Sequence, residues 1–282
     1  DSRRLVQTLT GTRNPERGTG NVNFLAPRTP YLAPDLMIAL LAAVPEETNL
    51  IRAALQDFAQ ESVNGVTLTS GTISGRKITL AHSGIGKAAA AATAVSLLTN
   101  CRPEALLLFG CGGAYLGTTL GLGDLALASG EIFGDEGVAT PEGFRDLAET
   151  KLPMRRTPEP FYNNWPVDNA LHDWAQPLLQ AHATDNKIKL RSGPFVTVST
   201  CTGSTVVATE IEQRTKGLCE NMEGAAVALA CQQLSTPLLE VRGISNLVED
   251  RDTSRWDLPA GMVAAQRAIL ELLKSWPEQH PQ

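Results

Sequence analysis

Two continuous runs of apolar residues constrain the fold of this chain more than any other feature of its sequence. Residues 37–44 (MIALLAAV) and 105–110 (ALLLFG) are of strand length and have no alternating polar positions. A strand with apolar side chains on both faces has to be covered on both faces, as happens when helices pack on the two sides of a parallel sheet. The runs therefore predict two central strands of a layered α/β fold.

Segments of strand and helix character alternate along the chain as far as residue 276. Further strands are predicted at 66–73, 76–83, 124–133, 195–200 and 237–245. Helices are predicted at 50–58, in the Ala-rich part of 82–98, and at 171–182, 222–234 and 262–276. This alternation predicts a single three-layer α/β/α domain around a mixed, largely parallel twisted sheet.

No internal repeat or linker divides residues 36–276, which we assign to one domain. Residues 1–35 are rich in Arg, Gly, Pro, Thr and Asn, show no apolar period and lack the apolar segment of a secretory signal. We expect them to form an irregular N-terminal extension, and residues 277–282 to form a short C-terminal tail. The proline-rich segment 134–166 is predicted to be a long irregular insertion.

The composition argues against several classes of partner. A net charge of −6 leaves no basic footprint for nucleic acid and disfavours adhesion to anionic membranes. No segment approaches the ~20 consecutive apolar residues that a membrane-spanning helix needs. We therefore expect neither a nucleic acid nor a membrane as a partner.

The sequence also gives no sign of a metal or a cofactor. The five cysteines are odd in number, widely spaced and free of any CxxC pattern, so neither a disulfide framework nor a zinc site is indicated, and a reduced, cytoplasmic location is expected. The Gly-rich segments contain neither GxGxxG nor GK[ST], which leaves dinucleotide and ATP binding unsupported. Asp135 and Glu136 could form a metal pair, but a solvated turn is the favoured interpretation.

Polar residues follow the ends of several predicted strands, and in such sheets ligands bind beyond the carboxyl ends of the strands. These residues are Glu46 and Glu47, His82 to Gly86, Cys111 to Gly113, Ser199 to Ser204, and Asn246 to Asp252. Glu223 opens a predicted helix soon after the short run GLCEN. Two acids, an amide and three Gly-rich turns are therefore predicted to face one cleft.

Each of these features has an ordinary structural explanation when it is taken alone. Glu47 and Glu223 suit the first turn of a helix, where acidic side chains interact favourably with the helix dipole. Cys111 could be a thiol nucleophile, but a structural thiol is favoured because no His–Asn partner pattern accompanies it. His82 could be a base, although a single His near a strand end is more often structural.

Several segments resemble one known group of proteins when their order and spacing are taken together. MIALLAAVPEET, SGIGKAAAA, GCGGAYLGTTLGLGD, ENMEGAAVALAC and VRGISN resemble the nucleoside phosphorylase and nucleosidase superfamily, in its 5′-methylthioadenosine/S-adenosylhomocysteine nucleosidase branch. FGDEGVATPEGF, FVTVSTCTGS and RGISNLVEDRDTSRW resemble the futalosine hydrolases of that branch. This second resemblance implies cleavage of futalosine to hypoxanthine and dehypoxanthinylfutalosine in menaquinone synthesis. It also implies a nucleoside phosphorylase-like fold and a homo-oligomer.

The resemblance assigns roles by position in the matching segments. The acid that activates water corresponds to Glu47, and the Met-Glu pair that holds the ribose corresponds to Met222 and Glu223. The residue that addresses the purine corresponds to Asn246. Other residues in these segments are expected to contact the substrate; they are Ile85, Gly112, Ser204 and Arg242.

Asn246 departs from the pattern of the adenine-specific relatives, which have ISD where this chain has ISN. Hypoxanthine offers two acceptors, O6 and N7, and an amide supplies the matching N–H donors, whereas an ionised Asp would repel O6. Asn246 therefore favours a 6-oxopurine. Two alternatives stay open, namely a nucleosidase that releases adenine and a non-catalytic nucleoside sensor. Arg251 or Arg255 could bind an anionic 5′ substituent, although surface charges are the favoured interpretation.

Overall fold

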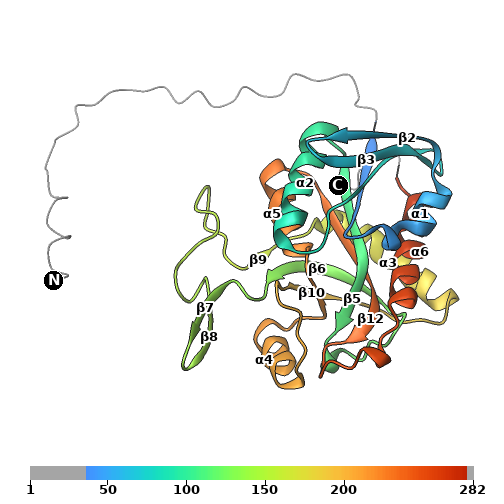
Figure 1. The fold of residues 1–282 in the computed structure, drawn as a ribbon. Coiled ribbons are helices and arrows are strands. Elements are labelled where there is room, and N and C mark those ends of the chain that lie inside the picture. Colours follow the sequence, from blue (N-terminus) through green and yellow to red (C-terminus); the bar gives the residue numbers. More distant parts are fainter. Residues whose placement is uncertain (1–35, 278–282) are drawn as a thin grey trace, which may run out of the picture. The chain divides into compact units, whose positions relative to one another are not determined.

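The computed structural model describes residues 36–277, which form alternating strands and helices (Figure 1). The strands are β1 (Met37–Ala42), β2 (Gln56–Val63), β3 (Val66–Ile73), β4 (Arg76–His82), β5 (Ala105–Ala114), β6 (Leu125–Phe133), β7 (Gly137–Thr140), β8 (Gly143–Asp146), β9 (Asn164–Trp165), β10 (Leu190–Thr197), β11 (Cys219–Asn221) and β12 (Leu238–Leu247). The helices are α1 (Asn49–Ala54), α2 (Lys87–Cys101), α3 (Asn169–Asp185), α4 (Thr205–Thr215), α5 (Gly224–Leu234) and α6 (Leu258–Lys274). The predicted irregular extension at 1–35 and almost all of the predicted tail lie outside the described residues.

One mixed sheet organises these elements. Its strand order is β11-β10-β6-β12-β5-β1-β4-β3-β2, with β9 added to β6. The central strands β4, β1, β5 and β12 are mutually parallel, so their carboxyl ends meet at the same edge. β11 also pairs with β5, and this pairing closes β5, β12, β6, β10 and β11 into a ring. The carboxyl ends of β5 and β12 lie at one end of that ring, and β1 ends at the same edge of the sheet.

The two apolar runs are buried on both faces, as predicted. In β1, Ala39 and Leu41 face a core built with α2 and α5, whereas Ile38 and Leu40 face a second core built with α1, α3 and α6. In Figure 1 these two groups of helices lie on opposite sides of the sheet. The predicted three-layer α/β/α fold is therefore confirmed, with one apolar core on each side of the sheet.

The edge strand β2 was not predicted. The predicted helix at 50–58 ends at Ala54, and residues 56–63 form the edge strand β2 instead. β2 joins β3 through Asn64 and Gly65, which both have a positive φ. An Asn-Gly pair favours a two-residue hairpin turn of this type, and the pairing with β3 outweighs the helical pattern of the preceding residues.

The predicted turn at Cys111–Gly113 is also a strand, because β5 continues to Ala114. These residues pair with β12, and a Cβ at Gly112 would come too close to the sulfur of Cys219 and the carbonyl oxygen of Glu220. The glycines therefore permit close approach of β11 to β5 and do not mark a turn. Because Gly112 has no side chain, β11 can pair with β5 and close the ring of strands.

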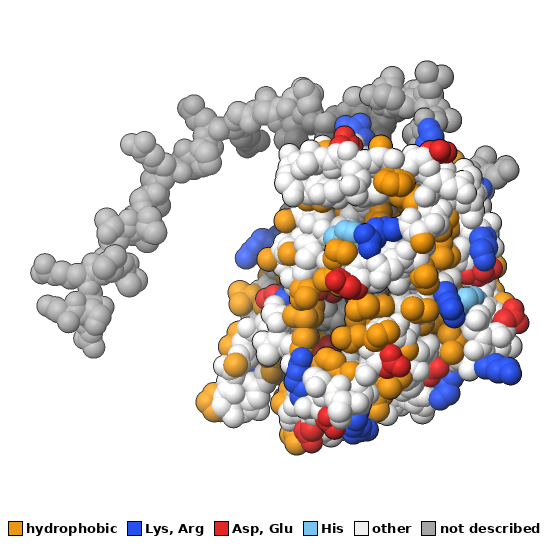
Figure 2. All heavy atoms as spheres, turned by 45° about the vertical axis from the view of Figure 1, so that its right-hand side comes forward, with side chains coloured by type: hydrophobic (Ala, Val, Ile, Leu, Met, Phe, Trp, Pro, Cys, Tyr) orange, Lys and Arg blue, Asp and Glu red, His pale blue; other side chains and the backbone are white. Residues whose placement is uncertain are grey.

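Other differences concern shorter elements. The segment 134–166 is mostly irregular, as predicted, but contains the hairpin β7–β8 and the short strand β9. The predicted strand at 195–200 begins earlier and ends at Thr197, and α4 was not predicted. No helix within residues 36–277 has the length and apolar character needed to cross a membrane. On the face shown in Figure 2, acidic and basic side chains are interspersed and do not form one basic stripe.

Candidate active site

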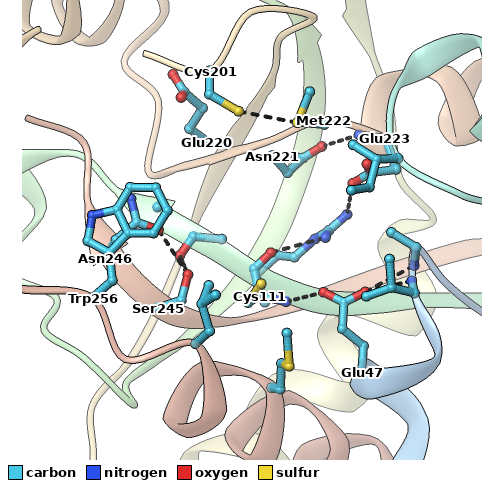
Figure 3. A pocket seen from close by; sticks show the side chains of 18 of the residues that line it. Glu47, Cys111, Cys201, Glu220, Asn221, Met222, Glu223, Ser245, Asn246 and Trp256 are labelled. Carbon is cyan, nitrogen blue, oxygen red and sulfur yellow. Dashed lines mark hydrogen bonds and ion pairs between the residues drawn. The ribbon is translucent and has the colours of Figure 1, made fainter. Parts of the chain in front are cut away.

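A pocket of about 310 Å³ opens at the carboxyl ends of the central strands. Its lining comes from the segments that follow β1 and β4, from β5, β11 and β12, and from the start of α6. Glu47, Glu223 and Asn246, the three predicted catalytic residues, all line it. In Figure 3, Glu47 and Glu223 lie on one side of the pocket and Asn246 lies on the other.

Glu47 lies in a 3₁₀ turn that Pro45 begins directly after β1. Its carboxyl group is only 3% exposed and accepts hydrogen bonds from the backbone N–H groups of Ala43 (3.0 Å), Val44 (3.3 Å) and Cys111 (2.8 Å). A Cβ at Gly110 would collide with Glu47 Oε1, so the glycine makes room for the acid. Both oxygens act as acceptors, which is how an ionised carboxylate binds.

Glu223 stands at the N-terminal boundary of α5 and is 4% exposed. One of its oxygens accepts a hydrogen bond from the backbone N–H of Gly86 (3.0 Å), and the other faces Arg242 Nη2 at 3.4 Å. The side chain of Asn221 caps this helix, because its Oδ1 accepts hydrogen bonds from the backbone N–H groups of Glu223 (2.9 Å) and Gly224 (2.7 Å). The helix start and Arg242 together fix the Glu223 carboxylate at the pocket wall.

Asn246 is held on β12, where the register with β5 shifts between Ile244 and Asn246. The hydroxyl of Ser245 donates to Asn246 Oδ1 (2.9 Å), and Asn246 Nδ2 donates to the carbonyl oxygen of Leu247 (3.1 Å). An inverted amide would place two acceptors, Oδ1 and the Leu247 carbonyl, against each other. The amide orientation is therefore fixed, and Nδ2 keeps a second N–H for a ligand.

Four of the five predicted substrate-binding residues line the pocket: Met222, Ile85, Gly112 and Arg242. Ser204 does not. It lies at the N-terminal boundary of α4, and Cys201 and Thr202 of the same loop line the pocket instead. The predicted residue therefore lies in a loop that reaches the pocket but does not itself line it, because nothing in STCTGS indicates which residue turns inward.

Trp256 and Glu220 are among the lining residues that were not singled out from the sequence. Trp256 lies on the same side of the pocket as Asn246 in Figure 3, and the guanidinium of Arg251 lies 4.6 Å from the centre of the Trp256 ring. Glu220 is buried, and its carboxyl group accepts hydrogen bonds from the Thr202 N–H (2.9 Å), the Thr202 hydroxyl (2.6 Å) and the Tyr115 hydroxyl (3.0 Å). Trp256 ends the matching segment RGISNLVEDRDTSRW, which was the available signal for it.

The other candidate chemical groups have structural surroundings. Burial raises the pKa of the Cys111 thiol to about 12, so the thiolate that a nucleophile requires is absent at neutral pH. His82 does not line the pocket and makes a 2.8 Å hydrogen bond with the hydroxyl of Thr48. Asp135 and Glu136 lie in an accessible bend after β6, as predicted, and both form ion pairs with Lys87. Residues 36–277 contain no cluster of three or more metal-ligating side chains.

Several known proteins match this chain over most of its length. A 5′-methylthioadenosine/S-adenosylhomocysteine nucleosidase of Psychromonas ingrahamii is 27% identical over 242 residues, which are 83% of this chain and 96% of that protein. The crystal structure of such a nucleosidase from Colwellia psychrerythraea in complex with adenine has a TM-score of 0.76 at 21% identity, covering 88% of this chain and 98% of that one. The structure of futalosine hydrolase of Helicobacter pylori has a TM-score of 0.73 at 21% identity, covering 85% and 98% of the two chains.

The family is shown by a separate and more general match. The family model described as the phosphorylase superfamily matches residues 37–275, which include every strand and helix described above. The matched range also contains Glu47, Glu223 and Asn246. The chain belongs to the phosphorylase superfamily.

Proposed function

We propose that this protein hydrolyses the N-ribosidic bond of a purine nucleoside. The observation that carries the proposal is the arrangement of the pocket, with two buried carboxylates on one side and a fixed amide on the other. Breaking an N-ribosidic bond builds positive charge on the sugar and negative charge on the departing base. Carboxylates suit the first charge and N–H donors suit the second.

The two carboxylates have different partners and suit different tasks. Glu47 is held by backbone N–H groups and is positioned to take a proton from a water molecule that attacks the anomeric carbon. Glu223 can accept hydrogen bonds from ribose hydroxyls, and each such charge-assisted bond contributes about 1.5–3 kcal/mol. Its negative charge also lies beside the cation that develops on the sugar. Glu47 is therefore the proposed base and Glu223 the proposed ribose ligand.

The charges at the pocket favour water over phosphate as the nucleophile. Among the described lining residues the cations are Arg242 and Arg251. Arg242 is already bound to Glu223 and Glu240, and Arg251 lies over the Trp256 ring. A phosphate site needs an available Arg or Lys or a free helix N-terminus near the ribose. The start of α5 is already capped by Asn221, and Glu47 would repel the phosphate dianion. The charges of the lining residues therefore favour hydrolysis over phosphorolysis.

The amide of Asn246 supports a 6-oxopurine as the base. Its remaining Nδ2 proton can be donated to O6 or N7, while Ser245 and Leu247 hold the rest of the amide. An amide is not an acid, so the departing base is stabilised by hydrogen bonding and takes its proton from water. Futalosine is the substrate that we propose, with hypoxanthine and dehypoxanthinylfutalosine as products.

A second candidate is the release of adenine from 5′-methylthioadenosine or S-adenosylhomocysteine. The names of the curated relatives support it, because those at 24–27% identity are nucleosidases for these two compounds. The two candidates share the fold, the water-activating acid and the ribose ligand, and differ at the base. Asn246 is the observation that favours the first.

Purified protein incubated separately with futalosine, aminofutalosine and methylthioadenosine distinguishes the candidates. We expect hypoxanthine from futalosine, at a kcat/KM above that for adenine release from either 6-amino compound. Faster release of adenine would replace our first candidate by the second. Nucleoside binding without any turnover would instead support a non-catalytic sensor. The matched negative control is Glu47→Gln, which removes the proposed base.

A further inference from the structure

Two carboxyl groups lie behind the pocket wall and do not line it. Glu131 on β6 is 1% exposed, and Glu240 on β12 is fully buried. An isolated buried carboxylate is so costly that it normally takes up a proton or finds a cation. A pair of them next to the proposed ribose ligand therefore needs a physical explanation.

The contacts of the two groups leave one oxygen of each without a donor. Glu240 Oε1 accepts a hydrogen bond from Arg242 Nε (2.8 Å), and Glu131 Oε2 accepts one from the Thr197 hydroxyl (3.2 Å). Glu131 Oε1 and Glu240 Oε2 have no hydrogen-bond partner among the described residues. A Cβ at Gly224 would collide with carboxyl oxygens of both groups, so the two carboxyls converge on the first residue of α5.

One proton resolves this arrangement. Two ionised carboxylates are acceptors only and repel each other, whereas a neutral acid donates a hydrogen bond to its neighbour. Burial and the adjacent Glu240 hold the pKa of Glu131 well above its usual range. Burial also raises the pKa of Glu240, but the guanidinium of Arg242 acts in the opposite direction. Glu131 is therefore the partner that keeps the proton, and Glu240 is the anion.

Arg242 connects this pair to the pocket. Its Nε binds Glu240 at 2.8 Å, its Nη1 donates to the carbonyl oxygen of Cys111 (3.2 Å), and its Nη2 faces Glu223 at 3.4 Å. The shorter contact is with Glu240, so Glu240 balances most of the guanidinium charge. Glu223 then keeps its own negative charge for the ligand in front of it.

We propose that Glu131 and Glu240 are positioning residues: neutral Glu131 donates a hydrogen bond to the Glu240 carboxylate, which anchors Arg242 and leaves the charge of Glu223 for the ribose. This inference rests on the proposed function, since it assigns Glu223 to the sugar. Arg242 and Glu223 are the charged neighbours of the pair, and two cysteine thiols close to it stay protonated. Burial raises the pKa of the Cys219 thiol on β11 and of the Cys231 thiol on α5.

The shared proton is tested by the pH dependence of stability. Because the pKa of Glu131 is higher in the folded than in the unfolded chain, the folded state binds more protons above the unfolded pKa, and wild-type stability falls as pH rises. Glu131→Gln keeps a neutral hydrogen-bond donor but has no carboxyl proton to lose, so its stability should not fall in this way. We expect the difference between its urea midpoint and that of the wild type to increase in favour of the variant from about pH 5 to about pH 8.

Glu271→Gln is the matched control, because it makes the same chemical change at a surface carboxyl that pairs with Lys274. Its midpoint should run parallel to that of the wild type across the same pH range. If the urea midpoints of Glu131→Gln and the wild type change with pH in parallel, the proposal that the pair shares a proton is wrong.

The positioning role is tested by kinetics with the nucleoside that the wild type hydrolyses. We expect Glu240→Gln and Glu131→Leu to raise the riboside KM or lower kcat on the order of tenfold, and Glu131→Gln to retain most of what Glu131→Leu loses. Inhibition by free purine base should be unchanged in all three variants, because Asn246 lies on the opposite side of the pocket. A merely structural defect would weaken base binding as well.

Two results oppose the positioning role, and a third concerns the proposed function alone. An equal loss in Glu131→Gln and Glu240→Gln would show that Glu131 acts as an anion, and wild-type kinetics in Glu240→Gln would remove Glu240 from the site. If the wild type hydrolyses no purine nucleoside, the proposed function fails. The stability measurement then still supports or overturns the shared proton.

Discussion

Replacing Asn246 by Asp is the sharpest test of how the base is selected. The carboxylate keeps an oxygen for the Ser245 hydroxyl, but its second oxygen replaces the Nδ2 that donates to the Leu247 carbonyl at 3.1 Å. Two acceptors then face each other there, and the donor for purine O6 is lost. Purine O6 then lacks its donor in the bound state, and a buried acceptor without a donor costs about 1–3 kcal/mol. This cost corresponds to a fall in kcat/KM of roughly 5- to 150-fold.

Futalosine and aminofutalosine form the matched substrate pair for this assay, since they differ only at position 6 of the purine. We expect Asn246→Asp to lower kcat/KM for futalosine by the factor above and to preserve or raise it for aminofutalosine, whose amino group donates to a carboxylate. Asn100→Asp, which makes the same change at the exposed end of α2, controls for the added charge. An unchanged ratio of the two kcat/KM values would refute base selection by Asn246.

Three further predictions concern catalysis, pH dependence and packing. Glu47→Gln should lower kcat by about 10²- to 10⁴-fold with little change in nucleoside affinity, and turnover near the wild-type rate would exclude Glu47 as the base. Burial lowers the pKa of His82, so acidification favours the unfolded chain, and the wild type should lose stability below about pH 6.5 more steeply than His82→Gln; equal slopes in urea unfolding would contradict this. Gly224→Ala should destabilise the fold by about 1–3 kcal/mol, because its Cβ would collide with Glu131 and Glu240, and an unchanged Tm would argue against that packing.

Much of the architecture could be predicted because it depends on local patterns. The apolar runs at 37–44 and 105–110 are buried on both faces. Glu47 and Asn246 lie at the same edge of the sheet because β1 and β12 both run parallel to β5. The edge strand β2 was missed because its residues also fit a helical period. The Asn64–Gly65 turn signal was the better evidence.

The buried acid pair illustrates what local patterns do not contain. Glu131 and Glu240 each interrupt an apolar segment, and the sequence alone does not tell whether such an acid points to solvent or inward. Their proximity arises from the antiparallel placement of β12 beside β6, together with a helix start that brings Gly224 against both. That placement is a property of the closed ring of strands, so it emerges only in three dimensions.

The register shift in β12 has a consequence for how this pocket can change. Arg242 and Asn246, which the proposed function assigns to the sugar side and to the base, are carried by the same strand on either side of that shift. The distance between residues 242 and 246 is therefore set by the backbone pairing of β12 with β5 and not by side chains. Under the proposed function, we expect a substitution at position 246 to change which base is bound and to leave Glu47 and Glu223 in place. Loss or gain of one residue at the shift would turn position 246 to the other face of the strand and separate the two ends of the substrate from their partners.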